Sequence, residues 1–241
     1  MDLFLIRHGE SSNNALADAS QRVADPELTD KGREQKDCVA EYIGEGLHLY
    51  PAEREEDRPF LDRLYCSAMI RALHTAEPIG RALSLAPEIW VDIHETGGIF
   101  LDHGGERGKV GYSGQTRAEI AGRFPDAIAP AAIGDDGWWN KGMEEWHEAH
   151  GRGIAVAAQL VARAGDKERI GLVTHGNFMN LLIRALGNQL PHGGAVYEHD
   201  NTAITRISIE SQNFMLVEYL NRTEHLSDGL RMPRRFPMAM V

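Results

Sequence analysis

The stretch LFLIRHGES, residues 3–11, determines how this chain is interpreted. Its four apolar residues predict a short buried strand, which ends on Arg7 and His8. A histidine can be a neutral nucleophile near neutral pH, and the planar, permanently charged fork of an arginine suits phosphate oxygens. Gly9 lets the backbone turn tightly toward a ligand, and Ser11 can cap a helix whose N-terminus favours anions. The stretch therefore predicts phosphoryl chemistry at the end of a first strand.

The chain has 241 residues, enough for a sizeable core without disulfides, and residues 1–241 are expected to form a single domain. Cys38 and Cys66 lie in apolar-patterned segments, as the reduced thiols of a cytoplasmic protein do. No signal peptide fits the start, and no apolar stretch approaches membrane-spanning length. The formal net charge of −11 disfavours nucleic-acid and membrane partners but allows a small phosphorylated substrate. The oligomeric state stays open, a homo-oligomer included.

Apolar runs alternate with helical patterns along the chain. Strands are expected near residues 3–6, 64–66, 89–91, 170–174, 203–209 and 214–220. Helices are expected near residues 30–43, 69–83, 116–124, 143–164 and 178–186. Residues 51–59 are expected to form a charged loop, and the tail from Ser227 to wrap the surface. The alternation predicts an α/β fold, a three-layer α/β/α sandwich with a largely parallel central sheet.

Polar side chains follow four of these strands. Arg7 and His8 come after the first strand, and Arg71 begins the helix after the second. Glu95 follows the third strand, and His175 follows the strand at 170–174. Taken singly, these residues fit a solvated helix arginine, a loop carboxylate and a capping or core histidine. Because ligands gather at the carboxyl ends of parallel strands, their joint placement predicts one site.

Four ordered motifs carry a family resemblance. Residues 5–11, with Asn14 six positions after His8, resemble the signature of the histidine phosphatase superfamily, which includes the phosphoglycerate mutases. Three further stretches are similar to motifs of that family, namely LTDKGREQ at 28–35, CSAMIRALHTA at 66–76 and VTHG at 173–176. The resemblance implies a phosphoglycerate mutase-like fold over residues 3–95 and 168–220, and it is weak between 97 and 142.

The resemblance also implies a mechanism. His8 would attack phosphorus and carry a phosphohistidine, which divides the reaction into two displacements. Arg7, Arg71 and His175 would surround the transferring oxygens and meet the charge that develops there. Adjacent cations lower a histidine pKa, so a neutral His8 nucleophile is physically consistent with this setting. The arginines supply the positive charge, and we therefore expect neither a metal nor another cofactor.

Glu95 is expected to be the general acid and base, which protonates the leaving alkoxide and then deprotonates water. Asn14, as a neutral donor, and Gly176 are expected to complete the phosphate site. Phytase-type members of the superfamily place an aspartate directly after the second histidine, where this chain has Gly176. The acid is therefore better sought at Glu95. Weaker candidates for it are Glu10, Glu88 and Glu106.

Two departures from the mutases favour hydrolysis. Mutases of this family follow the asparagine with Phe-x-Gly-Trp and their acidic glutamate with Arg-x-Tyr-Gly. Residues 15–26 contain no such segment, and Thr96, Gly97 and Gly98 follow Glu95. We expect a metal-independent phosphomonoesterase acting on a small phosphorylated metabolite. Mutase-type phosphoryl transfer, and a phospho-ligand-binding module without turnover, stay open as alternatives.

The segment 97–142 is rich in glycine, charge and turn residues, and it is expected to roof the site. Trp138 or Trp139 would pack on an organic moiety of the substrate. The alternative is a solvated loop that the two tryptophans anchor. A second anionic group of the substrate would contact three residues of this segment, His103, Arg107 and Lys109.

Overall fold

The computed structural model describes residues 1–191, 196–211 and 214–233. Its centre is a six-stranded sheet in the order β3-β2-β6-β1-β7-β8. Four neighbouring strands are parallel, β3 (Glu88–Ile89), β2 (Arg63–Cys66), β6 (Arg169–Thr174) and β1 (Asp2–Arg7). Two strands continue the sheet in antiparallel pairing, β7 (Ile204–Ser211) and β8 (Phe214–Arg222). The prediction of a largely parallel sheet is confirmed.

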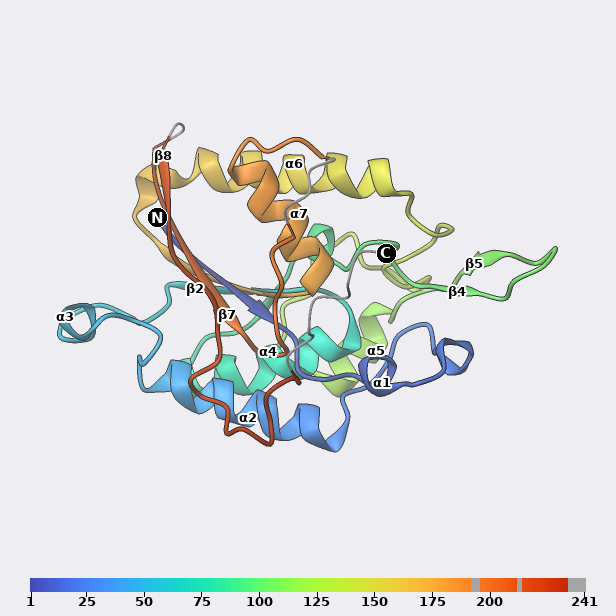
Figure 1. The fold of residues 1–241 in the computed structure, drawn as a ribbon, viewed down its shortest axis with the longest axis horizontal. Helices are drawn as coiled ribbons and strands as arrows, with labels where there is room; N and C mark the ends of the chain where they lie inside the picture. The colour runs from blue at the N-terminus through green and yellow to red at the C-terminus, as the bar shows by residue number, and fades with distance from the viewer. Residues whose placement is uncertain (192–195, 212–213, 234–241) are drawn as a thin grey trace.

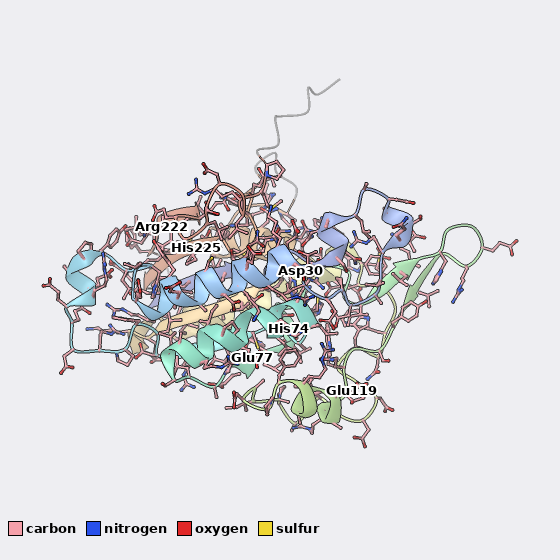
Figure 2. The ribbon with its side chains drawn as sticks, turned by 90° about the horizontal axis from the view of Figure 1, so that it is seen from below. Asp30, His74, Glu77, Glu119, Arg222 and His225 are labelled. Carbon is pink, nitrogen blue, oxygen red and sulfur yellow. The ribbon has the colours of Figure 1, made fainter. Side chains whose placement is uncertain are left out.

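Helices cover both faces of the sheet, as Figure 1 shows. On one face lie α2 (Asp30–Gly44) and α4 (Ile70–Leu83), and on the other α6 (Trp146–Ala162) and α7 (Gly176–Leu186). Figure 2 looks onto the α2 and α4 face, with Asp30 at the start of α2 and His74 on α4. The arrangement is the predicted α/β/α sandwich. None of the described helices is both long and apolar enough to cross a bilayer.

The alternation of side chains along β1 joins the two halves of the core. Ile6 packs in one buried cluster with Ile43 of α2, whereas Leu5 packs in the other with Leu160 of α6. Successive strand residues point to opposite faces, so four consecutive apolar residues serve both helical layers. Each such buried side chain contributes about 1.5–3 kcal/mol of burial free energy. This packing fixes the end of β1, where Arg7 and His8 follow.

Smaller elements complete the described chain. They are α1 (Ser12–Ala15), α3 (Pro51–Arg54), α5 (Arg117–Arg123), the hairpin of β4 (Phe100–Asp102) and β5 (Lys109–Gly111), and three short 3₁₀ turns, η1 (Ala19–Gln21), η2 (Val91–Ile93) and η3 (Ala164–Asp166). The β4–β5 hairpin projects from the body on the side opposite α3 (Figure 1).

Several element predictions were wrong in detail. The expected loop at 51–59 begins with α3, because Pro51 occupies a first-turn position, where the N–H that proline lacks would have no acceptor within the helix. The strand expected at 89–91 is reduced to β3, since η2 follows it at once. The long helix expected from 143 begins only at Trp146. Strand β8 lies at the sheet edge and leaves four apolar side chains exposed instead of closing the core, Phe214, Leu216, Val217 and Leu220.

The described part of the tail does lie against the surface. Gln35 Nε2 of α2 donates to the Leu230 carbonyl at 2.7 Å, and Lys31 Nζ donates to the Arg231 carbonyl at 3.2 Å. Met232 then reaches the cavity described below. Residues 234–241, with Pro237, lie outside the described residues.

Candidate active site

The parallel strands β1, β2 and β6 end at one edge of the sheet, where a cavity of about 1120 Å³ opens. Arg7 and His8 reach this cavity from the end of β1, and Arg71 reaches it from the first turn of α4. Glu95 lines it from the loop after η2, and Gly176 lines it at the start of α7. The structure therefore brings together residues that the sequence places far apart, at the edge where such sheets bind ligands.

The buried ring of His8 is fixed at both of its nitrogens. Nε2 is 3.1 Å from Arg71 Nε, and because a guanidinium group only donates, Nε2 must accept. The proton is then on Nδ1, which donates to the Gly9 carbonyl at 2.6 Å. Burial, followed by the charges of Arg71 and Arg7, lowers the pKa of His8 well below its ordinary value. His8 is therefore neutral at neutral pH, with its lone pair on Nε2.

Gly9 has a different purpose from the one the sequence suggested. A Cβ atom at Gly9 would lie 2.5 Å from the Gly32 carbonyl oxygen, and one at Gly32 would lie 2.0 Å from the Glu10 carbonyl oxygen. The two backbones touch, so each position excludes a side chain. Gly9 thus lets the nucleophile's loop rest against the first turn of α2, where Thr29 accepts the Gly32 N–H at 3.0 Å as the N-cap.

Arg71 is anchored by an aspartate that the sequence analysis did not single out. Asp25 Oδ1 lies 3.6 Å from Arg71 Nη1, and both Asp25 carboxylate oxygens accept the Ile70 N–H at 3.3 Å. Burial raises the pKa of Asp25 to about 6, against the opposing effect of Arg71. Asp25 comes 45 residues before Ile70 in a segment without regular structure, so no strand-end pattern marks it.

Arg7 is held against the loop that precedes β7. Its Nη1 donates to the His199 carbonyl at 2.6 Å, and Asn201 Nδ2 of the same loop donates to the His8 carbonyl at 3.0 Å. A Cβ atom at Gly176 would lie 3.4 Å from Arg7 Nε, in ordinary van der Waals contact, so Gly176 packs directly beside the guanidinium group.

His175 is fully buried, with its ring centroid 5.0 Å from that of His8. Its Nε2 pairs with Ser67 Oγ at 2.8 Å, and this Oγ also accepts the Met69 N–H at 3.3 Å. When the Ser67 hydroxyl donates to Nε2, the ring proton is on Nδ1, which has no hydrogen-bond partner among the described residues. In this tautomer, Nδ1 is a buried donor beside the nucleophile, and a phosphate oxygen would satisfy it.

The Glu95 carboxylate sits at the N-terminus of α7. Oε1 accepts the N–H groups of Thr96 at 2.9 Å and Phe178 at 3.0 Å, and Oε2 accepts the Asn177 N–H at 3.3 Å. A helix N-terminus favours a carboxylate there. These contacts fix the side chain at the cavity wall.

Asn14 presents its amide in one orientation. Its Oδ1 accepts the N–H of Ser11 at 3.2 Å and the hydroxyl of Ser11 at 3.0 Å, and it lies 3.5 Å from Asn201 Nδ2. The carbonyl end is thus occupied, so the Nδ2 group is the end available to donate to a ligand in the cavity. Within the residues that the structure describes, no three His, Cys, Asp or Glu side chains form a group that could hold a metal ion. The expected absence of a metal and of a cofactor remains a prediction.

The sequence model of the histidine phosphatase superfamily (branch 1) matches residues 3–222. This chain belongs to that superfamily. The predicted family is confirmed, and with it the prediction that the protein is an enzyme of the histidine phosphatase type. A comparison with curated protein sequences gives no match.

Solved structures of other phosphatases share the fold of this histidine phosphatase superfamily member. The mycobacterial glucosyl-3-phosphoglycerate phosphatase is similar with a TM-score of 0.55 and 23% identity, over 92% of this chain and 99% of that one. A phosphoserine phosphatase from Entamoeba histolytica gives 0.57 and 22%, over 94% and 99%. A putative alpha-ribazole-5'-P phosphatase from Escherichia coli gives 0.59 and 20%, over 92% and 96%. At these identities, the likeness shows the fold alone.

In this superfamily member, the segment 97–142 adds little to the described cavity wall, to which it contributes Gly98 and Phe100. The β4–β5 hairpin extends away from the body (Figure 1). The hairpin carries the three residues expected to bind a second anionic group, namely His103, Arg107 and Lys109. Their side chains are exposed and do not line the cavity. A two-stranded hairpin without a covering layer points such side chains into solvent.

Trp138 and Trp139 are buried in the core and anchor the loop that carries Glu95. Their ring centroids lie 5.6 Å and 4.9 Å from that of His94. Gly98 has a φ of +69°, and a Cβ atom there would lie 2.1 Å from the Trp139 ring. The tryptophans therefore fit the anchoring alternative and do not form a surface for the substrate.

Much of the cavity wall was missed by sequence reasoning. Among the described residues, the arginines that line the cavity are Arg7, Arg71 and Arg22. Arg22 comes from the segment between the first two motifs. No periodic pattern marks these loop residues, although a lone arginine in a segment between two phosphate motifs was a usable signal. The other unanticipated lining residues are Asn13, Val23, Ala24, Pro26, Thr96, Phe100, Asn177, Asn180, Val196, Tyr197, Glu198, His199 and Met232.

Proposed function

We propose that this protein is a phosphomonoesterase that hydrolyses a small phosphorylated metabolite through a phosphohistidine on His8. The observation that carries the proposal is the state of His8, a neutral ring whose Nε2 lone pair meets Arg71 Nε at 3.1 Å in the cavity. A neutral nucleophile among cations is suited to an anionic phosphorus centre. The family membership and the phosphatase names of similar structures support the same reaction.

In the first half of the reaction, the Arg71 Nε–H moves from His8 Nε2 to a phosphate oxygen, and the freed Nε2 lone pair attacks the phosphorus. A P–N bond forms, and the ester P–O bond breaks. Glu95 gives its proton to the leaving oxygen, so that the product leaves as an alcohol. Arg7, Arg71 and the His175 Nδ1–H donate to the equatorial phosphate oxygens and meet the charge of the transition state. Asn14 Nδ2 adds a neutral donor to the same oxygens.

In the second half, water takes the place of the alcohol, and Glu95 accepts its proton as the water attacks the phosphorus. The P–N bond breaks, its electron pair returns to Nε2, and inorganic phosphate leaves. His8 is then neutral again, with its proton on Nδ1. The same residues serve both halves, because the two displacements are related by microscopic reversibility.

Phosphate release from p-nitrophenyl phosphate, with and without chelator, tests this proposal. The wild type is expected to turn over in chelator, and His8→Ala to lose at least about 10³-fold in kcat/KM because the nucleophile is gone. Rapid quenching of a ³²P-labelled substrate should trap an acid-labile, base-stable label on the wild type alone. A folded His8→Ala protein with wild-type turnover would refute the phosphohistidine.

The mutase alternative is an outcome of a parallel measurement. If the protein interconverted 2- and 3-phosphoglycerate faster than it released phosphate from either one, phosphoryl transfer would replace hydrolysis as its reaction. We expect release to dominate, since residues 15–26 and 96–98 lack the mutase segments described above.

A further inference from the structure

A buried ion pair lies behind the loop that carries Glu95. Arg152 of α6 makes a two-pronged contact with Glu144, from Nε to Oε1 and from Nη2 to Oε2, both at 2.7 Å. The Glu144 side chain is 2% exposed and that of Arg152 is 10% exposed. The third nitrogen of the guanidinium group, Nη1, is directed at the Glu95 loop.

The ion pair makes hydrogen bonds to the backbone on both sides of Glu95. Arg152 Nη1 donates to the Asp92 carbonyl at 2.7 Å and to the His94 carbonyl at 3.0 Å. Glu144 Oε2 accepts the Gly97 N–H at 3.3 Å, and the Glu144 N–H donates to the Gly97 carbonyl at 3.0 Å. The Arg152–Glu144 pair therefore holds the loop just before and just after Glu95, the residue expected to transfer the proton.

Arg152 of the same pair also packs against the start of α7, which holds the Glu95 carboxylate. The guanidinium carbon of Arg152 lies 4.7 Å from the centroid of the Phe178 ring, over which it stacks. Phe178 is the residue of α7 whose N–H holds Glu95 Oε1 at 3.0 Å. Arg152 thus fixes the loop that carries the carboxylate and the helix end that receives it, relative to one another.

Stability does not explain this arrangement well. Removing two charges from water costs several kcal/mol per ion, and well-packed apolar residues often stabilise a core as much or more. We propose that Glu144 and Arg152 are positioning residues, which set the distance from the Glu95 carboxylate to the ester oxygen of the substrate. The inference rests on the proposed function, because it assumes that Glu95 is the proton donor.

A positioning role has a kinetic consequence that a merely structural role lacks. The p-nitrophenolate group leaves without a proton, whereas an alkoxide must be protonated as its P–O bond breaks. A displaced Glu95 therefore slows the hydrolysis of an alkyl phosphate and leaves the aryl phosphate reaction nearly unchanged. General acid catalysis contributes about 10²–10⁴-fold, and a misplacement of about 1 Å costs about 10²-fold.

The experiment measures kcat/KM for glycerol 2-phosphate and for p-nitrophenyl phosphate on each preparation of Arg152→Lys and of Glu144→Gln. Both substrates are assayed on one sample, so the unfolded fraction cancels in the ratio of the two values. We expect the alkyl-to-aryl ratio to fall at least about tenfold, with the aryl value within about threefold of wild type. Arg152→Lys keeps the charge, and it carries the test if Glu144→Gln does not fold.

Two controls separate the possible failures. Glu95→Gln tests the proposed function itself and should lower the ratio by about 10²-fold or more. Glu53→Gln breaks a matched two-pronged pair with Arg206, whose contacts are 2.5 Å and 2.7 Å at the other end of the sheet, and it should leave the ratio unchanged.

The outcomes then differ. If Glu95→Gln lowers the ratio while Arg152→Lys and Glu144→Gln do not, the positioning role is refuted and the acid role stands. An equal fall of the ratio in Glu53→Gln would also refute it, because general loosening would be the cause. If Glu95→Gln leaves the ratio unchanged, the acid role of Glu95 fails, and the positioning role fails with it.

Discussion

The arginines at the two ends of the parallel strands are held in opposite ways. At the carboxyl end, Arg7 donates to the His199 carbonyl and Arg71 donates to His8, while the Asp25 oxygen is 3.6 Å from Arg71. At the amino end, Arg206 contacts Asp2 at 3.1 Å and Glu53 at 2.5 Å.

The difference separates charges held for a ligand from charges held for the fold. A neutral acceptor at 3.1 Å, and a carboxylate at the limit of contact, leave the guanidinium group of Arg71 able to attract an anion. The close carboxylates at the amino end satisfy Arg206 within the protein. A chain with a net charge of −11 therefore presents a local cationic site where the substrate phosphate is expected.

The largest effect is expected from removing a cation at the carboxyl end. Arg71→Met takes away the donor to His8 Nε2 and a charge facing the transferring oxygens, and kcat/KM should fall by about 10³-fold. Steady-state hydrolysis of p-nitrophenyl phosphate measures it, with circular dichroism to verify the fold. A loss below about tenfold would place Arg71 outside the transition-state contacts.

The matching change at the amino end should leave chemistry alone and weaken the fold. Arg206→Met leaves the carboxylates of Asp2 and Glu53 without their cation next to buried surface. The free energy of unfolding should therefore fall by about 3–5 kcal/mol. Urea denaturation measures the loss. The kcat/KM of the folded variant, assayed well below its melting temperature, should stay within about twofold of wild type. A tenfold loss of kcat/KM would contradict the proposed separation between charges held for a ligand and charges held for the fold.

Asp25 contacts a cavity arginine and also affects the stability of the fold. The pH dependence of the free energy of unfolding tests this second effect. Burial raises its pKa to about 6 in the folded protein, whereas an unfolded chain titrates an aspartate near pH 3.9. The folded state therefore binds the extra proton, and the stability from this group is present below about pH 4 and lost as pH rises through about 6.

Asp25→Asn should remove that pH dependence. The free energy of unfolding of the variant minus that of wild type should increase from pH 4 to pH 7, by on the order of 2–3 kcal/mol. Urea melts at several pH values give this difference. A constant difference across the range would show that Asp25 does not titrate there.

The smallest effect is expected at an exposed cluster on the α4 face. Glu27 contacts Arg123 at 2.7 Å and His74 at 2.9 Å, and its side chain is 47% exposed (Figure 2 labels His74). Glu27→Gln should cost less than about 1 kcal/mol, and less still in high salt. Denaturation at low and high salt tests this. A cost as large as that of Arg206→Met would mean that exposure does not separate the weak pairs from the strong ones.

Sequence reasoning worked where a residue type and a strand end coincide. His8, Arg71 and His175 were predicted to share a site because parallel strands share an edge. The structure brings the three side chains together, although the fully buried His175 does not line the cavity. The fold followed from the alternation of apolar strands with helical patterns, and the four apolar residues of β1 pack against both helical layers. Local pattern and global topology agree in these parts of the chain.

It failed where a contact joins loops with no periodic pattern. Asp25 reaches Arg71, and Arg152 reaches the carbonyl of Asp92, across long stretches of chain that only tertiary packing brings together. The substrate roof stays a prediction, because charge and glycine content do not distinguish a lid from a projecting hairpin such as the one that carries His103. The exposure of β8 likewise depends on its place at the sheet edge.

The contact between Gly9 and Gly32 limits how this enzyme can be re-engineered. Residues 12–28 form one wall of the cavity and lie between the two glycines, where the backbones touch. That wall can be exchanged as a cassette that keeps Asn14 and Asp25, in chimeras or in libraries selected for new substrates, provided that the crossover points fall outside both glycines. A library that randomised either glycine would lose the geometry of the nucleophile before any new specificity could be selected.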